Sequence, residues 1–334
     1  MATLSNAAIF YESAQAQQSF AAMTDSGDHM AFSLATKPWS NAAGYEYAVV
    51  PYGLATGGVI TPAVAASNNT VDVAAMTLYA PGMTGANATT GLISVGAATS
   101  IACTRGSTNG YRITSITVDS TGAVVAVAGT ESTAFTETRA AAGGPPLIPV
   151  GSVEIGQVRF SATTAAVVAA TEIYQVVGTH QERYDFPVWS EDPLLGKIKF
   201  ASALPLIHTG FVAKKVQARV ATPVFAEIPR SKDWKPADTS NSVSSDNFYD
   251  GPVGSTSSTV SQASFTASLG DGTTDALLAK AGQILIFKFM PDRNKLPYQL
   301  TQGVLGVTRT FAVGANPSGA FTVSASKATV NLAS

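Results

Sequence analysis

YRITSITVDSTGAVVAVA, residues 111–128, carries the clearest fold signal in the chain. Residues 111–118 alternate well enough between apolar and polar side chains to predict a strand. Ser120-Thr121-Gly122 supplies a turn, and residues 123–128 return as the partner strand. The sequence therefore predicts a β-hairpin at this position.

Other stretches carry the same kind of signal. Residues 153–160 change the parity of their apolar positions at Gly156, which predicts a strand with a β-bulge. The chain also contains 29 Gly and 17 Pro, which predict many turns. Both observations favour an all-β fold of the sandwich or barrel type. Further strands are expected over residues 214–222, 284–289, 305–311 and 321–330, whereas residues 167–177 fit either a strand or a short helix.

Two segments favour a helix within this β chain. Residues 273–282 have a Thr cap, Asp275 in the first turn, Lys280 in the last turn and Gly282 as a stop, so one short α-helix is predicted there. Residues 5–23 are rich in Ala and Gln, with Ser5 as a plausible N-cap, and a short helix is possible there as well.

The distribution of charge divides the chain. At 334 residues the chain exceeds the usual size of one domain. Between Glu46 and Arg105 the only charged side chain is Asp72. We therefore expect residues 53–182 to form an inserted or decorating small β domain, and residues 1–52 together with 183–334 to form a second β domain.

The first and second halves of the chain also differ in net charge. Residues 1–182 contain 5 Lys and Arg against 11 Asp and Glu, whereas residues 183–334 contain 15 against 11. Opposite charges at the two ends of a subunit would suit head-to-tail stacking of copies. The alternative is that two domains simply differ in charge.

A polar segment interrupts the second part. Residues 233–259 are rich in Ser, Asp, Asn, Thr and Gly and lack a strong apolar period. A connection of that length is unusual in a compact domain, so we expect a long arm or an interaction loop. Trp39, Trp189 and Trp234 lie near Pro-rich breaks and are core anchors by default. The position of Trp234 inside the polar segment favours an interface instead.

The sequence offers no foothold for catalysis, so we expect no enzyme, no cofactor and no metal site. His29, His180 and His208 are not at metal-ligand spacing, and Cys103 stands alone. Residues 270–275 resemble half a calcium loop, but a turn leading into the capped helix explains them better. No apolar stretch reaches membrane-spanning length and no signal peptide is visible, so synthesis in the cytoplasm is expected.

The last third of the chain resembles the tail tube (major tail) proteins of long-tailed bacteriophages. The resemblance covers residues 183–334 and, less closely, the first fifty, and it is a pattern of composition and order without a diagnostic motif. The order is polar arm, strand, short helix, strand and strand. The residues that carry it are Asp246-Asn247-Phe248-Tyr249-Asp250-Gly251-Pro252, Ser264-Phe265-Thr266-Ala267-Ser268-Leu269, the strand at 284–289, Pro291-Asp292-Arg293 and residues 298–311.

The resemblance implies a structural virion protein with a tail-tube-type fold. Subunits of that family close into six-membered rings around a shared inner β-barrel, and the rings stack through the arm into a hollow tube. DNA passes through the tube, a tape-measure protein occupies it during assembly, and tail-end proteins close it. Assembly takes place in the host cytoplasm, and the lumen is expected to be acidic. The expected inter-subunit residues in the arm are Trp234, Asp246, Phe248, Tyr249 and Asp250.

Residues 53–182 leave two alternatives open. This small-residue β domain would also fit a phage head fibre, a decoration protein or a receptor-binding protein. The second alternative is an enzyme or a carbohydrate-binding module, and it depends only on the generic β character of the domain. Trimeric assembly would favour the first alternative, and saturable sugar binding would favour the second.

Overall fold

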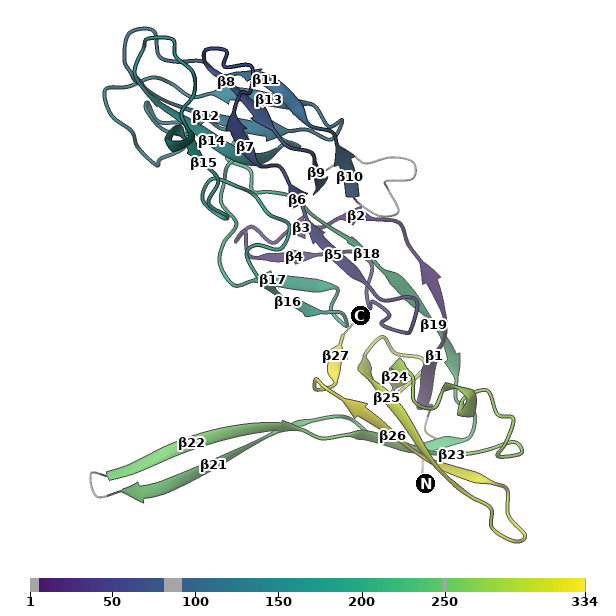
Figure 1. The fold of residues 1–334 in the computed structure, drawn as a ribbon. Helices are drawn as coiled ribbons and strands as arrows, with labels where there is room; N and C mark the ends of the chain where they lie inside the picture. The colour runs from purple at the N-terminus through teal and green to yellow at the C-terminus, as the bar shows by residue number, and fades with distance from the viewer. Residues whose placement is uncertain (1–5, 81–91, 249–250, 334) are drawn as a thin grey trace.

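A computed structural model describes residues 6–80, 92–248 and 251–333, without the side chains of residues 245–253. All the sheets in these residues are built from antiparallel strands, and the only helical segments among them are two 3-10 turns, Ala170–Glu172 (η1) and Leu278–Lys280 (η2). The predicted all-β fold is confirmed. The molecule is elongated, with small sheets at one end and a large sheet at the other (Figure 1).

The large sheet joins both ends of the sequence. Its strands run in the order β19-β1-β24-β25-β26-β23-β20, and β27 pairs with β25. Phe265 stacks on Phe321 with ring centroids 4.8 Å apart, and Leu285 and Phe287 are fully buried beside them. The strands are Ala221–Glu227 (β19), Ala8–Gln17 (β1), Ile284–Met290 (β24), Tyr298–Thr310 (β25), Ser318–Ala325 (β26), Ala263–Ser268 (β23), Ser231–Lys235 (β20) and Val330–Leu332 (β27).

Two smaller sheets form the middle of the molecule. Trp39 is fully buried between them, and Phe32 packs edge-on against Phe200 at 5.6 Å. One sheet consists of Trp189–Asp192 (β16), Lys197–Phe200 (β17), Ala31–Ser33 (β4) and Thr24–Asp25 (β3). The other consists of Ala21–Ala22 (β2), Val216–Arg219 (β18) and Ala48–Pro51 (β5).

Three sheets at the far end enclose a core of residues between Tyr52 and Val168. The predicted hairpin at 111–128 is confirmed, as β12 and β13. The predicted bulge is also confirmed, because Ile116 pairs with Gly156 whereas Thr117 pairs with Glu154. The strands are Gly53–Gly57 (β6), Ile60–Pro62 (β7), Thr70–Val73 (β8), Met76–Tyr79 (β9), Leu92–Val95 (β10), Ala98–Ala102 (β11), Tyr111–Val118 (β12), Val124–Ala128 (β13), Val153–Ser161 (β14) and Ile173–Tyr174 (β15).

The buried clusters subdivide the expected domains. Residues assigned to one tube-forming domain contribute to one core in the middle sheets and another in the large sheet. A third, small cluster joins Leu194 to Ile286 and Leu300 of the large sheet. The expected strand at 214–222 is accordingly two strands, β18 and β19, because the chain passes at Val220 from a middle sheet to the large one. The domain boundaries at 52/53 and 182/183 stay predictions.

The expected helix at 5–23 is wrong for its described part. Residues Ala8–Gln17 form β1, which pairs with β19 on one side and β24 on the other. Ala and Gln are good helix formers, but intrinsic propensity is a weak preference. Ladders with two strands more than two hundred residues away outweigh it. Ser5, the expected N-cap, lies outside the described residues.

The predicted helix at 273–282 is also wrong, since only η2 is helical there. The Asp275 carboxylate accepts hydrogen bonds from the backbone N–H of Gly270 (2.7 Å) and of Gly272 (2.9 Å), which holds a turn rather than a helix start. Leu277 is buried in the core, and Gly282 N–H donates to the Leu305 carbonyl. Tertiary contacts therefore replace a helix too short to be stable alone.

Glu12 is a fully buried carboxylate that links the large sheet to the middle of the molecule. Its Oε1 accepts hydrogen bonds from the Ser40 hydroxyl and from Gln15 Nε2 (2.8 Å), and its Oε2 accepts one from Ile286 N–H (3.0 Å). It lies at a register shift between β1 and β19, where the strand pairing needs local support.

Replacing Glu12 with Ala is expected to lower the free energy of unfolding by about 2–4 kcal/mol. The substitution leaves the Ile286 N–H and the Ser40 hydroxyl buried without their acceptor. Urea unfolding of the full chain measures the loss. Glu46→Ala is the control, because Glu46 is exposed, and it should change stability little. Equal effects of the two substitutions would contradict the role assigned to Glu12.

Candidate functional site

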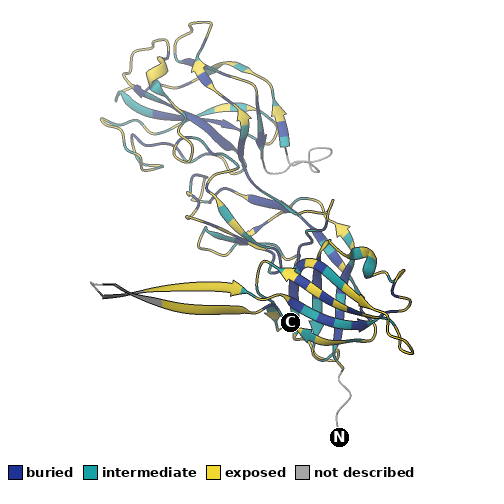
Figure 2. Ribbon diagram, turned by 60° about the horizontal axis from the view of Figure 1, so that its bottom comes forward, coloured by how far each residue is buried: buried dark blue, intermediate teal, exposed yellow. Residues whose placement is uncertain are grey.

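The most prominent candidate site is a two-stranded arm. Thr239–Phe248 (β21) and Gly251–Val260 (β22) pair along their whole length, from Thr239 opposite Val260 to Phe248 opposite Gly251. The arm projects sideways from the large sheet, away from the rest of the molecule (Figure 1). Its residues 239–244 and 254–259 are exposed, and Figure 2 shows these parts of the arm in the colour for exposed residues.

The base of the arm is fixed to the large sheet. Thr329 N–H donates to the Ala237 carbonyl at 2.7 Å, and Ala237 N–H donates to the Thr329 hydroxyl at 2.8 Å. Val260 packs against the core of the large sheet. These contacts hold the direction in which the arm leaves the body.

One face of the arm is a ladder of hydroxyl groups. Three cross-strand pairs are hydrogen-bonded, with oxygen–oxygen distances of 2.6–3.0 Å. This alternation of Ser and Thr was present in the sequence and could have revealed the strands, because period-two spacing places these hydroxyls on one face. The pairs are Ser240 with Thr259, Ser242 with Ser257 and Ser244 with Ser255.

Both strands of the arm are edge strands, because the arm is a sheet of only two strands. Each strand therefore has one ladder partner and one outer edge of backbone N–H and C=O groups. Edge strands usually carry charged residues that discourage pairing with other chains. Here Asp246 is the only charged residue of β21, and β22 has none. Val243, in the middle of the arm, is 76% exposed.

The structure places the five residues expected at the contact between subunits in different parts of the chain. Trp234 lies in β20 and stacks on Phe289 with centroids 5.7 Å apart, while its Nε1 donates to Gln299 Oε1 at 3.0 Å. It therefore serves the large sheet within its own chain, and its expected place in the arm is corrected. Asp246 and Phe248 lie in β21, and Tyr249 and Asp250 lie outside the described residues.

A second exposed surface adjoins the large sheet. At the end of the β25–β26 hairpin, Phe311 is 59% exposed and Val313 is fully exposed. The sequence predicted the strands at 305–311 and 321–330 but not the exposed apolar residues between them. Their position gives the large sheet another surface on which a partner could pack.

The histidine and cysteine side chains considered for chemical roles have contacts that explain them as structural residues. His208 is buried, with Nε2 2.9 Å from the Ser152 carbonyl and Nδ1 3.3 Å from the Val212 carbonyl. Burial raises the pKa of the Cys103 thiol to about 12, so the thiol stays protonated at neutral pH. His29 instead contacts the carboxylate of Asp25, four positions before it in the sequence.

The half calcium loop is a closed turn. Asp271 accepts hydrogen bonds from the Thr274 hydroxyl and from the N–H groups of Thr274 and Thr273, the latter two at 2.7 Å, and these bonds lower the pKa of its carboxyl. Within the described ranges, no group of three or more His, Cys, Asp or Glu residues is placed to hold a metal ion. The described residues also contain no helix long and apolar enough to cross a membrane.

Comparison of the chain with protein-family models, with curated proteins and with solved structures gives no match.

Proposed function

We propose that the chain is a structural virion protein whose copies form six-membered rings that stack into the hollow tail tube of a long-tailed bacteriophage. The observation that carries this proposal is the β21–β22 arm. The sequence resemblance supplies the six-fold ring and the tube, with the tape-measure protein and DNA inside it and tail-end proteins closing it. The structure contributes a physical reason for association between copies.

A two-stranded ribbon in water is marginally stable by itself. This arm has ten residues in each strand, and its described side chains are exposed apart from Val260 at its base. Covering its faces and completing its outer edges with a neighbouring chain would stabilise it. A second copy of the same chain is the partner that the resemblance implies.

The shape of the arm favours a heterologous contact. The arm of one copy would lie on the body of another, which is a head-to-tail arrangement that either closes into a ring or propagates as a filament. The large sheet has open edges at β19 and β20, and the exposed Phe311 and Val313 lie at its hairpin end. These features support lateral closure and axial stacking by one kind of subunit.

Val243→Lys is expected to weaken assembly at least about tenfold, measured as the protein concentration at which half of the chains are assembled. The substitution would bury an unpaired ammonium group in the contact between copies. Stability of the single chain should not change, because Val243 is 76% exposed. Sedimentation velocity over a range of concentrations measures assembly.

Val64→Lys is the matched control, since Val64 is 91% exposed in the turn between β7 and β8 at the far end of the molecule. It should assemble like the unmodified chain. If Val243→Lys and Val64→Lys assemble equally well, the arm does not mediate the contact.

One observation favours the alternative of a fibre, decoration or receptor-binding protein. The sheets formed by residues 53–182 lie at the end of the molecule opposite the large sheet and its arm (Figure 1). A free tip of this kind suits recognition of another surface. A trimer with this end exposed would support the alternative over the tube.

A further inference from the structure

A cavity of about 540 Å³ lies between the far-end sheets and the middle of the molecule. One side is formed by residues 137–154 and 178–183, and the other by residues 186–214. Its volume is in the range of sites that hold small molecules. Neither the arm nor the large sheet contributes to it, so it is independent of the assembly proposed above.

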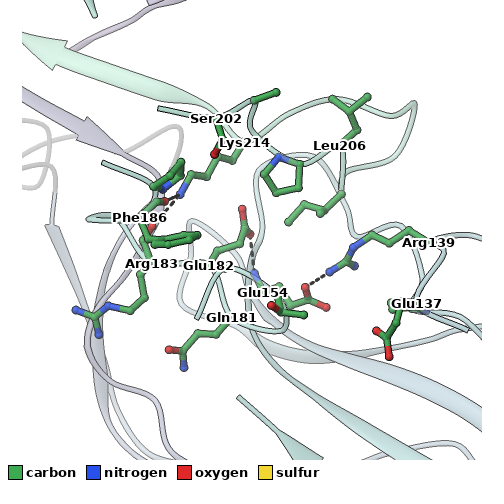
Figure 3. A pocket seen from close by; sticks show the side chains of 17 residues that line it. Glu137, Arg139, Glu154, Gln181, Glu182, Arg183, Phe186, Ser202, Leu206 and Lys214 are labelled. Atoms are coloured by element: carbon green, nitrogen blue, oxygen red, sulfur yellow. Dashed lines mark hydrogen bonds and ion pairs between the residues drawn. The ribbon is translucent and has the colours of Figure 1, made fainter. Parts of the chain in front are cut away.

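A buried carboxylate oxygen faces this cavity. Glu182 is only 8% exposed and its Oε2 accepts a hydrogen bond from Glu154 N–H at 2.9 Å, whereas its Oε1 has no hydrogen-bond partner among the described residues. Figure 3 shows the Glu182 carboxylate between Lys214 and Glu154, with one oxygen directed into the open space. A buried acceptor without a partner is costly, so a partner from outside the chain is expected.

A hydrogen-bond donor, Lys214, lines the cavity from its other side. Lys214 is 3% exposed, and its Nζ donates to the carbonyls of Arg183 (2.8 Å) and Phe186 (2.5 Å). An ammonium group has three N–H donors, so one is left for a ligand. Burial lowers the pKa of Lys214 to about 8, and the amine therefore remains a donor at neutral pH.

The remaining charges of the cavity are already paired. Arg139 forms an ion pair with Glu154, and Glu137 accepts two hydrogen bonds from Arg159 at 2.6 and 2.9 Å. Arg183 pairs with Asp185. A ligand with a net charge would face one free group of its own sign, either Glu182 or Lys214. A neutral ligand that both donates and accepts hydrogen bonds satisfies both groups.

The rest of the lining is apolar, and it includes an aromatic ring. Phe186 is 45% exposed and packs over Gly178, where a Cβ would lie 2.1 Å from the ring. The absence of a side chain at Gly178 thus lets the ring approach the backbone closely, while 45% of Phe186 stays exposed and available to a ligand. The other apolar lining residues are Pro145, Pro187, Pro205, Leu206 and Ile207.

We propose that this cavity binds a neutral polyhydroxylated ligand of sugar size, with Glu182 Oε1 accepting from one hydroxyl, Lys214 Nζ donating to another and Phe186 packing against the C–H face. Hydroxyl groups donate and accept, which matches the two free groups. The ligand can be a free monosaccharide or one residue of a polysaccharide, since both present the same hydroxyls.

Isothermal titration calorimetry of the full chain with glucose, galactose and N-acetylglucosamine tests the proposal. Dextran is the polymeric ligand in the same experiment. Saturable binding of at least one probe below about 10 mM is expected. Stronger binding of dextran than of glucose would identify a polymer as the source, and equal binding per sugar unit would identify the free sugar. No binding of any probe would overturn the proposal.

Variants assign the binding to this cavity. Glu182→Gln and Phe186→Ala should each weaken binding at least about tenfold, and Ser202→Trp, at an exposed lining position, should block it without removing a hydrogen bond. Glu46→Gln, at an exposed position outside the cavity, should bind normally. Circular dichroism verifies that each variant is folded. Unchanged binding in folded Phe186→Ala and Ser202→Trp would overturn the proposal.

Discussion

Replacing residues 241–258 with the dipeptide Asn-Gly is expected to leave a folded chain that forms neither rings nor tubes. Ser240 and Thr259 are paired, so a two-residue turn can join them. The deletion removes the exposed side chains of residues 241–244 and 254–258 and keeps Val260 and the Ala237–Thr329 hydrogen bonds at the base. The deletion therefore removes contacts between copies and not contacts within one chain. Sedimentation velocity should show monomers at concentrations at which the unmodified chain assembles.

The free energy of unfolding is the control for this deletion. Because the described arm residues contribute to the core only through Val260 at the base, urea unfolding of the single chain should change little. Assembly of the shortened chain to the same extent as the unmodified chain would exclude the arm as the connection. A large loss of stability would instead show that the arm supports its own subunit.

Arg139→Ala is expected to lower the free energy of unfolding by about 3–5 kcal/mol at pH 8. Arg139 is the ion-pair partner of Glu154, whose side chain is 1% exposed (Figure 3). It also donates to the Pro146 carbonyl at 2.8 Å. Removing it leaves a buried carboxylate with only the neutral donors Ser115 and Gln157 at its side chain. Urea unfolding measures the change.

The pH dependence of this loss has a defined sign. Burial raises the pKa of the Glu154 carboxyl above its ordinary value, and Arg139 opposes that rise. A carboxyl with a raised folded-state pKa costs stability once ionised, so stability falls as pH rises through that pKa. Without Arg139 the pKa rises further, and the deficit of Arg139→Ala should shrink between pH 8 and pH 5 as Glu154 binds a proton.

Two further variants separate charge from packing in this pair. Adding Glu154→Gln to Arg139→Ala removes the buried charge and should recover part of the stability at pH 8. Arg293→Ala breaks the exposed pair with Glu227 and should cost under about 1 kcal/mol. A deficit of Arg139→Ala that is the same at both pH values would show that lost packing, and not the charge of Glu154, explains it.

Local signals account for the parts of the fold that the sequence predicted correctly. The hairpin at 111–128 has its turn and both strands within eighteen residues. The neighbouring strand β14 pairs with β12, and Gly156 marks the bulge in β14. Strand β24 was predictable from the short run of apolar residues at 284–289, and Leu285 and Phe287 of this strand are buried.

Long-range pairing explains the parts that were missed. Strand β1 depends on ladders in which Glu12 is opposite Phe225 and Phe10 is opposite Lys288, and no local pattern reveals them. The segment at 273–282 has helix-type end residues, but Asp275 bonds backward to Gly270. Local propensity predicts such segments poorly because tertiary contacts decide them.

The candidate sites show the same contrast. The polar arm was predictable from its length and composition, although its strands extend over 239–260 and Trp234 lies outside them. The cavity was not predictable, because Glu182 and Lys214 are thirty-two positions apart and meet only where two groups of sheets adjoin. Neither residue lies in a motif that would suggest a ligand.

Negative-stain electron microscopy of the purified full chain tests the proposed assembly most directly. The arm, the open edges of the large sheet and the resemblance to tail tube proteins predict six-fold rings or long hollow tubes. Particles that remain monomeric or trimeric at every concentration would contradict the tail tube proposal.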